Sequence, residues 1–331
     1  MRHHLGSARY PAAGRQPVHD DAWSIVVAAA DGAEAAARAN QPAAFVLDDE
    51  RRLHPLAAAD PNGVIGWRPG LGWHLTVPRE DPRHSLIDLY LPICSATGKR
   101  PVTVGHLGQS LDGFIATHAG ESQYVTGQEN ILHLHRMRAL CDAVVVGAGT
   151  VAADDPQLTT RHVPGSSPLR VVLDPTRRLT DRYRVFSDAS AETLYVCAKS
   201  LTRPGESHFG RATLVAVEDH PTGVHVAELQ QLLLNRGCTR IFVEGGGVTV
   251  SAFLQENLLD RLHVAIAPLI IGEGRPAIRL LPPIALSDCL RPRYRVFRMG
   301  GDVLFDCDLK PDSRESADPR TDGMPPVTRV I

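Results

Sequence analysis

Short apolar runs alternate with helical patterns along most of the chain from residue 101 onward. The runs are typical of buried strands and cover 102–107, 142–146, 169–173, 193–196, 213–217, 239–243 and 262–267. Helical patterns lie between some of them, at 128–140, 224–235 and 248–257. Two runs that flank Gly300 and Gly301, at 293–299 and 303–308, predict a final hairpin. This alternation predicts a three-layer α/β domain whose mainly parallel sheet is covered by helices on both faces.

The helical pattern at 128–140 carries one stripe that we expect to be buried. It consists of residues at three-residue spacing, namely Ile131, Leu134, Met137 and Leu140. Arg138 lies near the end of this helix, where it either compensates the negative end of the helix dipole or binds an anion or a carbonyl group. His133 and His135 are two residues apart, so a helix sends them to different faces.

The first hundred residues have a different texture. Residues 21–38 are rich in alanine and predict a helix, and residues 43–47 predict a strand. Trp67 and Trp73 stand among many Gly and Pro residues, and we expect them to pack a small core rather than bind a ligand. Residues 95–100 (SATGKR) read as a linker.

The chain is therefore expected to consist of four parts. They are a disordered start (1–20), an N-terminal extension of unknown role (21–95), the α/β domain (101–309) and a disordered tail (310–331). The start has neither the long apolar run nor the cleavage pattern of a signal peptide.

Charge and composition exclude several classes of partner. The net charge is −2 and no basic block occurs, which argues against a nucleic acid or an anionic membrane as partner. No apolar run approaches the roughly 20 residues that span a bilayer. The six cysteines are scattered without a C-x-x-C pair, which fits a reducing compartment such as the cytoplasm. Among the 15 histidines no H-E-x-x-H motif or Cys/His cluster occurs, so we expect no metal.

A glycine turn follows the apolar run at 142–146. Gly147 and Gly149 would let the backbone approach a ligand, and with Ala152 and the later Asp174 they fit a dinucleotide-binding fingerprint. However, Pro156 should stop the next helix after about a turn and a half, which is too short for a crossover between parallel strands. The turn suits a phosphate without forming a Rossmann unit, although such turns also occur without a ligand.

A second glycine turn, Glu244 to Gly247, follows the run at 239–243 and precedes a helix. Two such turns at strand ends of one sheet indicate a ligand crevice, because ligands of open α/β sheets gather at that edge. Glu244 would point into this crevice, or it would only cap the helix or pair with an arginine.

A set of ordered motifs carries a resemblance to a known family. The motifs are QSLDG (109–113), ESQYVTG (121–127), MRAL (137–140), DAVVVGAGTVAADDPQLTTR (142–161), RVVLD (170–174), VEGGG (243–247) and LDRLHVAIAPLIIG (259–272). Together they resemble the pyrimidine reductase domain of riboflavin biosynthesis over residues 101–309. The resemblance implies a dihydrofolate-reductase-like fold, NADPH as cofactor, a homodimer, and hydride transfer to C1 of the ribosyl group of a 5-phosphoribosylamino-pyrimidine.

The resemblance also implies roles for particular residues. Cofactor positions are Gly108, Tyr124, Thr150, Asp154, Gly246, Gly247, Val248, Thr249, Val250, Ser251 and Ala252. Substrate positions are Ser122, Arg138, Leu158, Arg161 and Glu244. Glu244 is the candidate catalytic residue, which would orient the sugar or relay a proton.

Two departures from the family pattern stand out. Pro175 takes a position where relatives often have Ser beside the cofactor, and it has neither a hydroxyl nor an N–H for the 2′-phosphate of NADPH; Arg177, Arg178 or Lys199 could supply that contact instead. Residues 1–100 contain neither the H-x-E nor the P-C-x-x-C pattern of the zinc deaminase that bifunctional relatives carry, so we expect no deaminase activity.

Three alternatives remain beside the reductase hypothesis. The same fold and cofactor could serve another heterocyclic or imine substrate, or the chain could be a catalytically silent NADP-binding module. The Rossmann interpretation, in which Asp174 rejects a 2′-phosphate, predicts NADH instead of NADPH.

Overall fold

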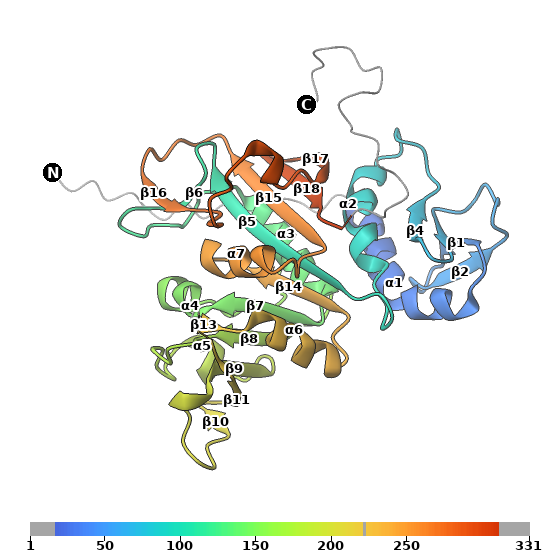
Figure 1. Cartoon of the computed structure of the whole chain (residues 1–331). Helices are drawn as coiled ribbons and strands as arrows, with labels where there is room; N and C mark the ends of the chain where they lie inside the picture. Colours follow the sequence, from blue (N-terminus) through green and yellow to red (C-terminus); the bar gives the residue numbers. More distant parts are fainter. Residues whose placement is uncertain (1–16, 221–222, 311–331) are drawn as a thin grey trace. The chain divides into compact units, whose positions relative to one another are not determined.

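The computed structural model describes residues 17–220 and 223–310, and the chain divides into two compact units, Met1–Ser95 and Ala96–Ile331 (Figure 1). The division falls at the start of the predicted linker. The first helix begins at Pro17, earlier than predicted, so residues 17–20 are helical. Residues 1–16 and 311–331 of the segments expected to be disordered lie outside the described residues.

The first unit combines two helices with a four-stranded antiparallel sheet of order β2-β1-β3-β4. Its elements are α1 (Pro17–Ala39), β1 (Ala43–Leu47), β2 (Leu53–Leu56), β3 (Ile65–Arg68), β4 (Gly72–Leu75) and α2 (His84–Cys94). The strand predicted at 43–47 is confirmed, whereas α2 was not predicted. Pro92 lies inside α2, and a proline in that position argues against a helix when only the sequence is read.

The two tryptophans form the centre of this unit, as expected. The rings of Trp67 and Trp73 meet edge to face with centroids 4.9 Å apart. Trp73 Nε1 donates a hydrogen bond to the backbone oxygen of Ala29 on α1 at 2.9 Å. Both side chains are buried, which ties the sheet to the first helix.

The second unit is built on a ten-stranded sheet of order β10-β11-β9-β8-β7-β14-β5-β15-β18-β17. Neighbouring strands from β11 to β15 are parallel, and β10, β18 and β17 are antiparallel to their neighbours. The strands are β5 (Val102–Ser110), β7 (Ala143–Gly147), β8 (Leu169–Leu173), β9 (Thr193–Ala198), β10 (His208–Phe209), β11 (Ala212–Val217), β14 (Arg240–Glu244), β15 (Arg261–Ala267), β17 (Arg293–Met299) and β18 (Asp302–Asp308).

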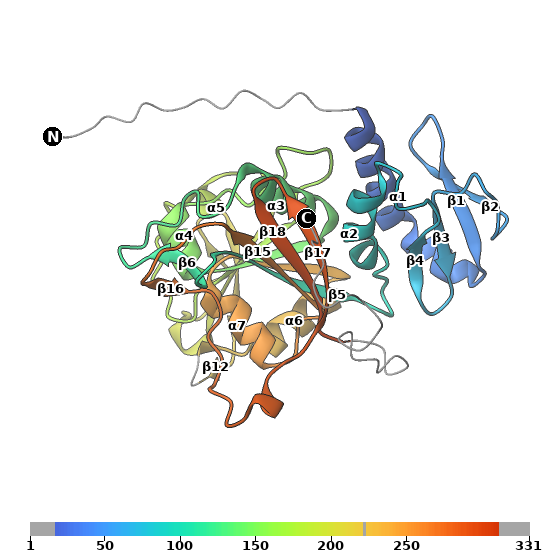
Figure 2. The same cartoon turned by 90° about the horizontal axis from the view of Figure 1, so that it is seen from above.

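Helices cover this sheet on both faces, with α3 on one side and α6 and α7 on the other (Figure 2). The helices are α3 (Gln128–Leu140), α4 (Ala148–Asp154), α5 (Arg184–Ser187), α6 (Val226–Asn235) and α7 (Gly247–Gln255). Smaller elements are β6 (Phe114–Thr117), β12 (Asp219–His220), β13 (Gly223–Val224), β16 (Gly274–Pro276) and the 3-10 turns Lys199–Leu201 and Leu286–Asp288. The predicted α/β architecture with a mainly parallel sheet is confirmed.

Alternation along the central strands decides which side chains meet which helix. Val145 of β7 packs in one apolar cluster with Leu229 of α6 and Phe253 of α7, so the side chain of the next residue along the strand points to the opposite face. Val243 of β14 belongs to the same cluster, and Glu244 therefore turns toward the face that α3 covers. The sheet thus presents Glu244 on the α3 side at its carboxyl edge.

The buried side of α3 differs from the predicted stripe. Met137 and Leu140 are buried as expected, but Ile131 is 39% exposed. Polar residues take the buried places instead, among them Asn130, His133, His135 and Arg138. These polar side chains can be buried because other segments supply hydrogen-bonding or charged partners for them. The spacing of apolar residues along the helix gives no information about such partners.

Within residues 17–220 and 223–310, no helix combines the length and the apolar character that a membrane crossing requires.

Candidate functional site

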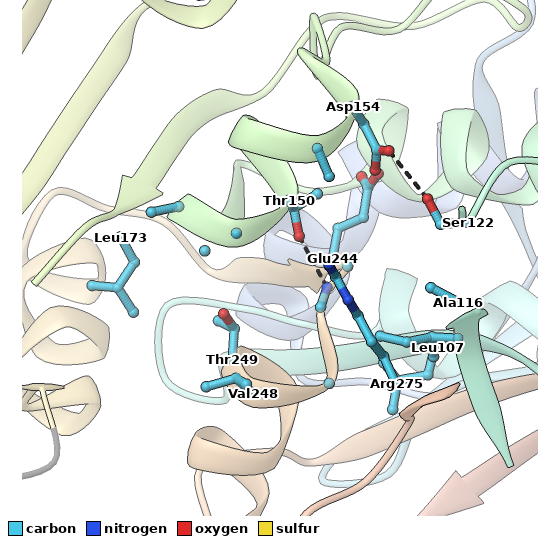
Figure 3. Close-up of a pocket in the computed structure, with 18 of the residues that line it drawn as sticks. Leu107, Ala116, Ser122, Thr150, Asp154, Leu173, Glu244, Val248, Thr249 and Arg275 are labelled. Carbon is cyan, nitrogen blue, oxygen red and sulfur yellow. Dashed lines mark hydrogen bonds between the residues drawn. The ribbon is translucent and has the colours of Figure 1, made fainter. Parts of the chain in front are cut away.

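A cavity of about 580 Å³ opens at the carboxyl ends of β5, β7, β8 and β14. Both predicted glycine turns line it, with Gly147 to Thr150 on one side and Glu244 to Thr249 on another. Figure 3 shows Thr150, Asp154, Glu244 and Arg275 among the side chains gathered around this cavity. The location agrees with the expectation that ligands of an α/β sheet bind where parallel strands end.

The two glycine turns are fixed against each other. The backbone N–H of Gly246 donates a hydrogen bond to Thr150 Oγ1 at 3.1 Å (Figure 3). A Cβ at Gly247 would lie 2.1 Å from the backbone oxygen of Ala277, so no side chain fits there. Gly245 has φ +88°, a backbone conformation that favours glycine. In the second turn, Gly245 is therefore required by its backbone conformation and Gly247 by the close approach of another backbone segment.

The helix after the first turn is as short as predicted. α4 has seven residues and ends at Asp154, and the capping residue Asp155 has a left-handed φ of +40°. Asp155 is held in this conformation by Arg184, whose backbone N–H donates to Asp155 Oδ1 at 2.7 Å. This length rules out α4 as the long crossover helix of a Rossmann unit.

Glu244 and Arg138 form a buried ion pair at the cavity. Arg138 Nε donates to Glu244 Oε2 at 2.8 Å, and Arg138 Nη2 donates to Oε1. Both residues are buried, and Arg138 Nη1 also donates to the backbone oxygen of Thr159 at 3.4 Å. The alternative that Glu244 pairs with an arginine is thus realised, while Glu244 still lines the cavity. A guanidinium fork orients the carboxylate and leaves its remaining lone pairs free to accept hydrogen bonds.

The structure brings most predicted site residues to the cavity. Those that line it are Gly108, Ser122, Thr150, Asp154, Glu244, Gly246, Gly247, Val248, Thr249 and Ala252. Ser122 Oγ donates to Asp154 Oδ1 at 3.2 Å, which joins a substrate position to a cofactor position (Figure 3).

The other predicted residues do not line the cavity. Tyr124 is 81% exposed with φ +66°, and Leu158 is buried with φ +57°. Val250 faces the apolar core of α6 and α7, and Ser251 accepts a hydrogen bond from the backbone N–H of Arg279 at 2.8 Å. A helix exposes only one face to a crevice, so a run of consecutive residues in α7 cannot all reach it. Their roles stay predictions.

Arg161 lies in a group of positive charges beside the ion pair. Its Nη1 donates to Thr159 Oγ1 at 2.6 Å, and its backbone N–H donates to His135 Nδ1 at 3.1 Å. Partial burial and the charges of Arg138 and Arg184 lower the pKa of Arg161 below its usual value. Arg138 pairs with Glu244 and Arg184 pairs with Asp155, so Arg161, which has no carboxylate partner within the described residues, is the member of this group that is available to an anion.

Three cations could contact the 2′-phosphate in place of the serine that relatives often have, and they differ in whether they are already paired. Arg177 forms an ion pair with Glu206, and Lys199 pairs with Glu218. Arg178 lines the cavity and forms no ion pair or hydrogen bond within residues 17–220 and 223–310. Of these three cations, Arg178 is therefore the one available to a ligand in the cavity.

Sequence reasoning missed several side chains at the cavity. His106, Asn130, Arg275 and Arg279 line it and were not predicted. Asp112 of the QSLDG motif accepts a hydrogen bond from the backbone N–H of Gly272 at 2.6 Å, which holds the chain leading to Arg275. The signal for His106 was its place two residues before Gly108 in one strand, where both point to the same face.

No group of His, Cys, Asp and Glu side chains that could hold a metal occurs among the residues that the structure describes.

Comparison with known proteins agrees with this geometry. The family described as the RibD C-terminal domain matches residues 102–291. A 2,5-diamino-6-ribosylamino-4(3H)-pyrimidinone 5′-phosphate reductase of Methanothermobacter thermautotrophicus is 32% identical over 218 residues, which are 64% of this chain and 99% of that protein. The riboflavin biosynthesis protein RibD of Aquifex aeolicus is 30% identical over 227 residues, 66% of this chain and 62% of that protein.

Solved structures give the same result. Acinetobacter baumannii RibD has a TM-score of 0.55 and 26% identity, covering 69% of this chain and 63% of that chain. This chain thus spans less than two thirds of the length of these two RibD proteins, and the dihydrofolate-reductase-like fold is the shared part. The chain belongs to the family of RibD C-terminal domains, whose similar members named here are proteins of riboflavin biosynthesis.

Proposed function

We propose that the chain is an NADPH-dependent reductase that acts on 5-amino-6-(5-phosphoribosylamino)uracil and delivers hydride to C1 of the ribosyl group. The observation that carries the proposal is the cavity of about 580 Å³ that both glycine turns line. Glu244, which forms a buried pair with Arg138, lines the same cavity. This volume falls within the range of small-molecule sites.

Arg178 supports NADPH over NADH. The exposed guanidinium of Arg178 lines the cavity beside Pro175 and can bind a phosphate without breaking an ion pair of the described residues. Asp174 also lines the cavity, and its carboxylate is engaged on one side only: Oδ2 accepts hydrogen bonds from Leu179 N–H at 2.9 Å and from Tyr195 OH at 2.8 Å, while Oδ1 has no partner among the described residues. The alternative in which Asp174 binds the ribose diol of NADH is therefore tested by comparing the two nucleotides.

The remaining chemistry needs mainly positioning. NADPH, when bound, supplies the hydride. Glu244 would accept a hydrogen bond from the sugar, and Arg138 would hold the carboxylate in place. Leu107, Ile115 and Leu173 give the cavity apolar walls that exclude water from the reacting centre. The positive charges around Arg161 would hold the substrate phosphate.

The experiment is calorimetric titration of the wild-type protein and of Arg178→Gln with NADPH and NADH. We expect the wild type to bind NADPH more tightly, and Arg178→Gln to lose about tenfold or more in NADPH affinity with little change for NADH. Arg182→Gln removes the same charge from an exposed residue that does not line the cavity, and it should behave as wild type. Binding of neither nucleotide would contradict both the proposed reductase and a silent NADP-binding module.

A second candidate substrate has its own support. The match to the Methanothermobacter thermautotrophicus protein covers 99% of that protein's length. That protein is named as a reductase of the 2,5-diamino-pyrimidinone, which carries an amino group where the uracil carries an oxygen. Parallel assays with both compounds decide between them. We also propose that the protein lacks deaminase activity and forms a homodimer, which product analysis and sedimentation would test.

A further inference from the structure

His106 is a titratable side chain at the cavity that neither the family resemblance nor the proposed chemistry uses. It lies on β5 in register with Glu244 on the parallel neighbour β14, and both side chains line the cavity. Adjacent parallel strands lie about 4.8 Å apart, so two side chains at matching positions on one face can contact one ligand together.

The orientation of the His106 ring is fixed from one side. Its Nε2 lies 2.9 Å from Asn130 Oδ1, and Asn130 Nδ2 donates to Thr126 Oγ1 at 2.9 Å. Because Nδ2 of the amide is used by Thr126, the amide oxygen faces the ring and Nε2 carries the proton. In the neutral ring Nδ1 is then a hydrogen-bond acceptor, and it has no partner within residues 17–220 and 223–310.

The surroundings of His106 keep the ring neutral. The side chain is 3% exposed, and burial together with the charges of His263 and Arg138 lowers its pKa to about 3. A group with this pKa is uncharged throughout the range in which the enzyme would work, so it cannot serve as a cationic phosphate ligand. An acceptor in the wall of the cavity that has no protein partner is available to a ligand hydroxyl.

We propose that His106 is a substrate-contacting residue whose Nδ1 accepts a hydrogen bond from a hydroxyl of the ribosyl group. This hydroxyl is the neighbour of the one that donates a hydrogen bond to Glu244. The inference rests on the proposed reductase function and specifies how the site recognises a sugar. Asn130 and Thr126 are positioning residues that fix the tautomer. Two adjacent acceptors select a ligand with two neighbouring hydroxyl groups, and such a pair is typical of a ribosyl group.

Two variants separate the two ring nitrogens. In His106→Gln the amide reaches the place of Nε2 and keeps the bond to Asn130, but nothing replaces Nδ1. In His106→Asn the shorter amide takes the place of Nδ1 and loses the bond to Asn130. We expect His106→Gln to lower substrate affinity about three- to tenfold with unchanged NADPH affinity, and His106→Asn to retain substrate affinity better at the expense of thermal stability. Both affinities are measured calorimetrically, with the substrate titrated in the absence of nucleotide.

Equal substrate affinity in His106→Gln and the wild type would overturn the inference. Wild-type protein that fails to bind the ribosylaminopyrimidine would instead overturn the proposed function. If His106→Gln does not fold, nitrogen NMR of histidine-labelled wild type replaces it. Substrate should then shift one unprotonated Nδ1 signal, assigned to His106 through His106→Asn, and an unshifted signal contradicts the inference.

Discussion

Arg138 of α3 and Glu244 of β14 are 106 residues apart in sequence and form a buried, two-pronged ion pair at the edge of the cavity. Removing one partner of such a pair leaves the other charge buried without compensation. Arg138→Ala should therefore lower the free energy of unfolding by about 3–5 kcal/mol, measured by urea denaturation. The double variant Arg138→Met/Glu244→Leu should regain most of this loss. A single variant as stable as wild type would show that the pair is not formed in solution.

Glu244→Gln keeps the shape of the side chain, but only the amide oxygen can still accept a hydrogen bond from Arg138, and the amide NH₂ group faces the second donor of the guanidinium. The free energy of unfolding is therefore measured together with turnover. We expect turnover to fall about 10- to 100-fold, since a neutral amide stabilises developing charge less well, with NADPH affinity nearly unchanged. Steady-state kinetics and nucleotide titration test this. Glu192→Gln, at an exposed carboxylate that pairs with Arg236, is the control. Full activity in Glu244→Gln would remove Glu244 from the mechanism.

Gly247 and Gly149 both belong to the glycine turns but differ in the space around them. A Cβ at Gly247 would lie 2.1 Å from the backbone oxygen of Ala277, whereas one at Gly149 would lie 3.5 Å from Arg178 Nη2. Gly247→Ala should therefore destabilise the protein by about 1–3 kcal/mol and weaken NADPH binding, while Gly149→Ala should leave stability unchanged. Thermal denaturation and titration give both quantities. Equal effects of the two substitutions would contradict the geometry.

The lowered pKa of His135 makes the free energy of unfolding depend on pH. Burial first, and then the charges of Arg138, His162 and Arg161, lower its pKa to about 3, whereas in the unfolded chain it is about 6.5. Below about pH 6.5 the unfolded state therefore binds a proton at His135 that the folded state does not bind, and the free energy of unfolding decreases as the pH falls. Between pH 7 and pH 5 this group contributes a loss of about 2 kcal/mol.

His135→Asn tests that dependence. The amide can still accept the hydrogen bond from the backbone N–H of Arg161 that Nδ1 accepts at 3.1 Å, but it does not titrate. Urea denaturation at several pH values should show a shallower loss of stability in this variant. An unchanged slope would mean that His135 titrates normally in the folded protein.

Local patterns predicted nine of the ten strands of the large sheet and most helices, because each of these elements is encoded within its own segment; short strands such as β6 and β10 were not predicted. The hairpin around Gly300 and the strand at 169–173 follow from such patterns. α2 was missed because Pro92 obscured its periodicity, and the exposure of Ile131 was not foreseen because polar residues of α3 have partners on distant strands.

The candidate site was predicted only in part for the same reason. Glycine turns and Glu244 stand at strand ends that the sequence reveals. His106 is recognised as a site residue from its register with Glu244, and Arg178 is recognised because the neighbouring Arg177 is already paired with Glu206. Both observations require the tertiary structure. Long-range pairing of this kind has no local signal.

The measurement that tests the central claim most directly is the loss of NADPH absorbance when the purified protein is mixed with 5-amino-6-(5-phosphoribosylamino)uracil. The account predicts substrate-dependent oxidation of NADPH, slower oxidation of NADH, and a ribitylamino product. Tight NADPH binding without oxidation in the presence of this substrate or its 2,5-diamino-pyrimidinone counterpart would contradict it.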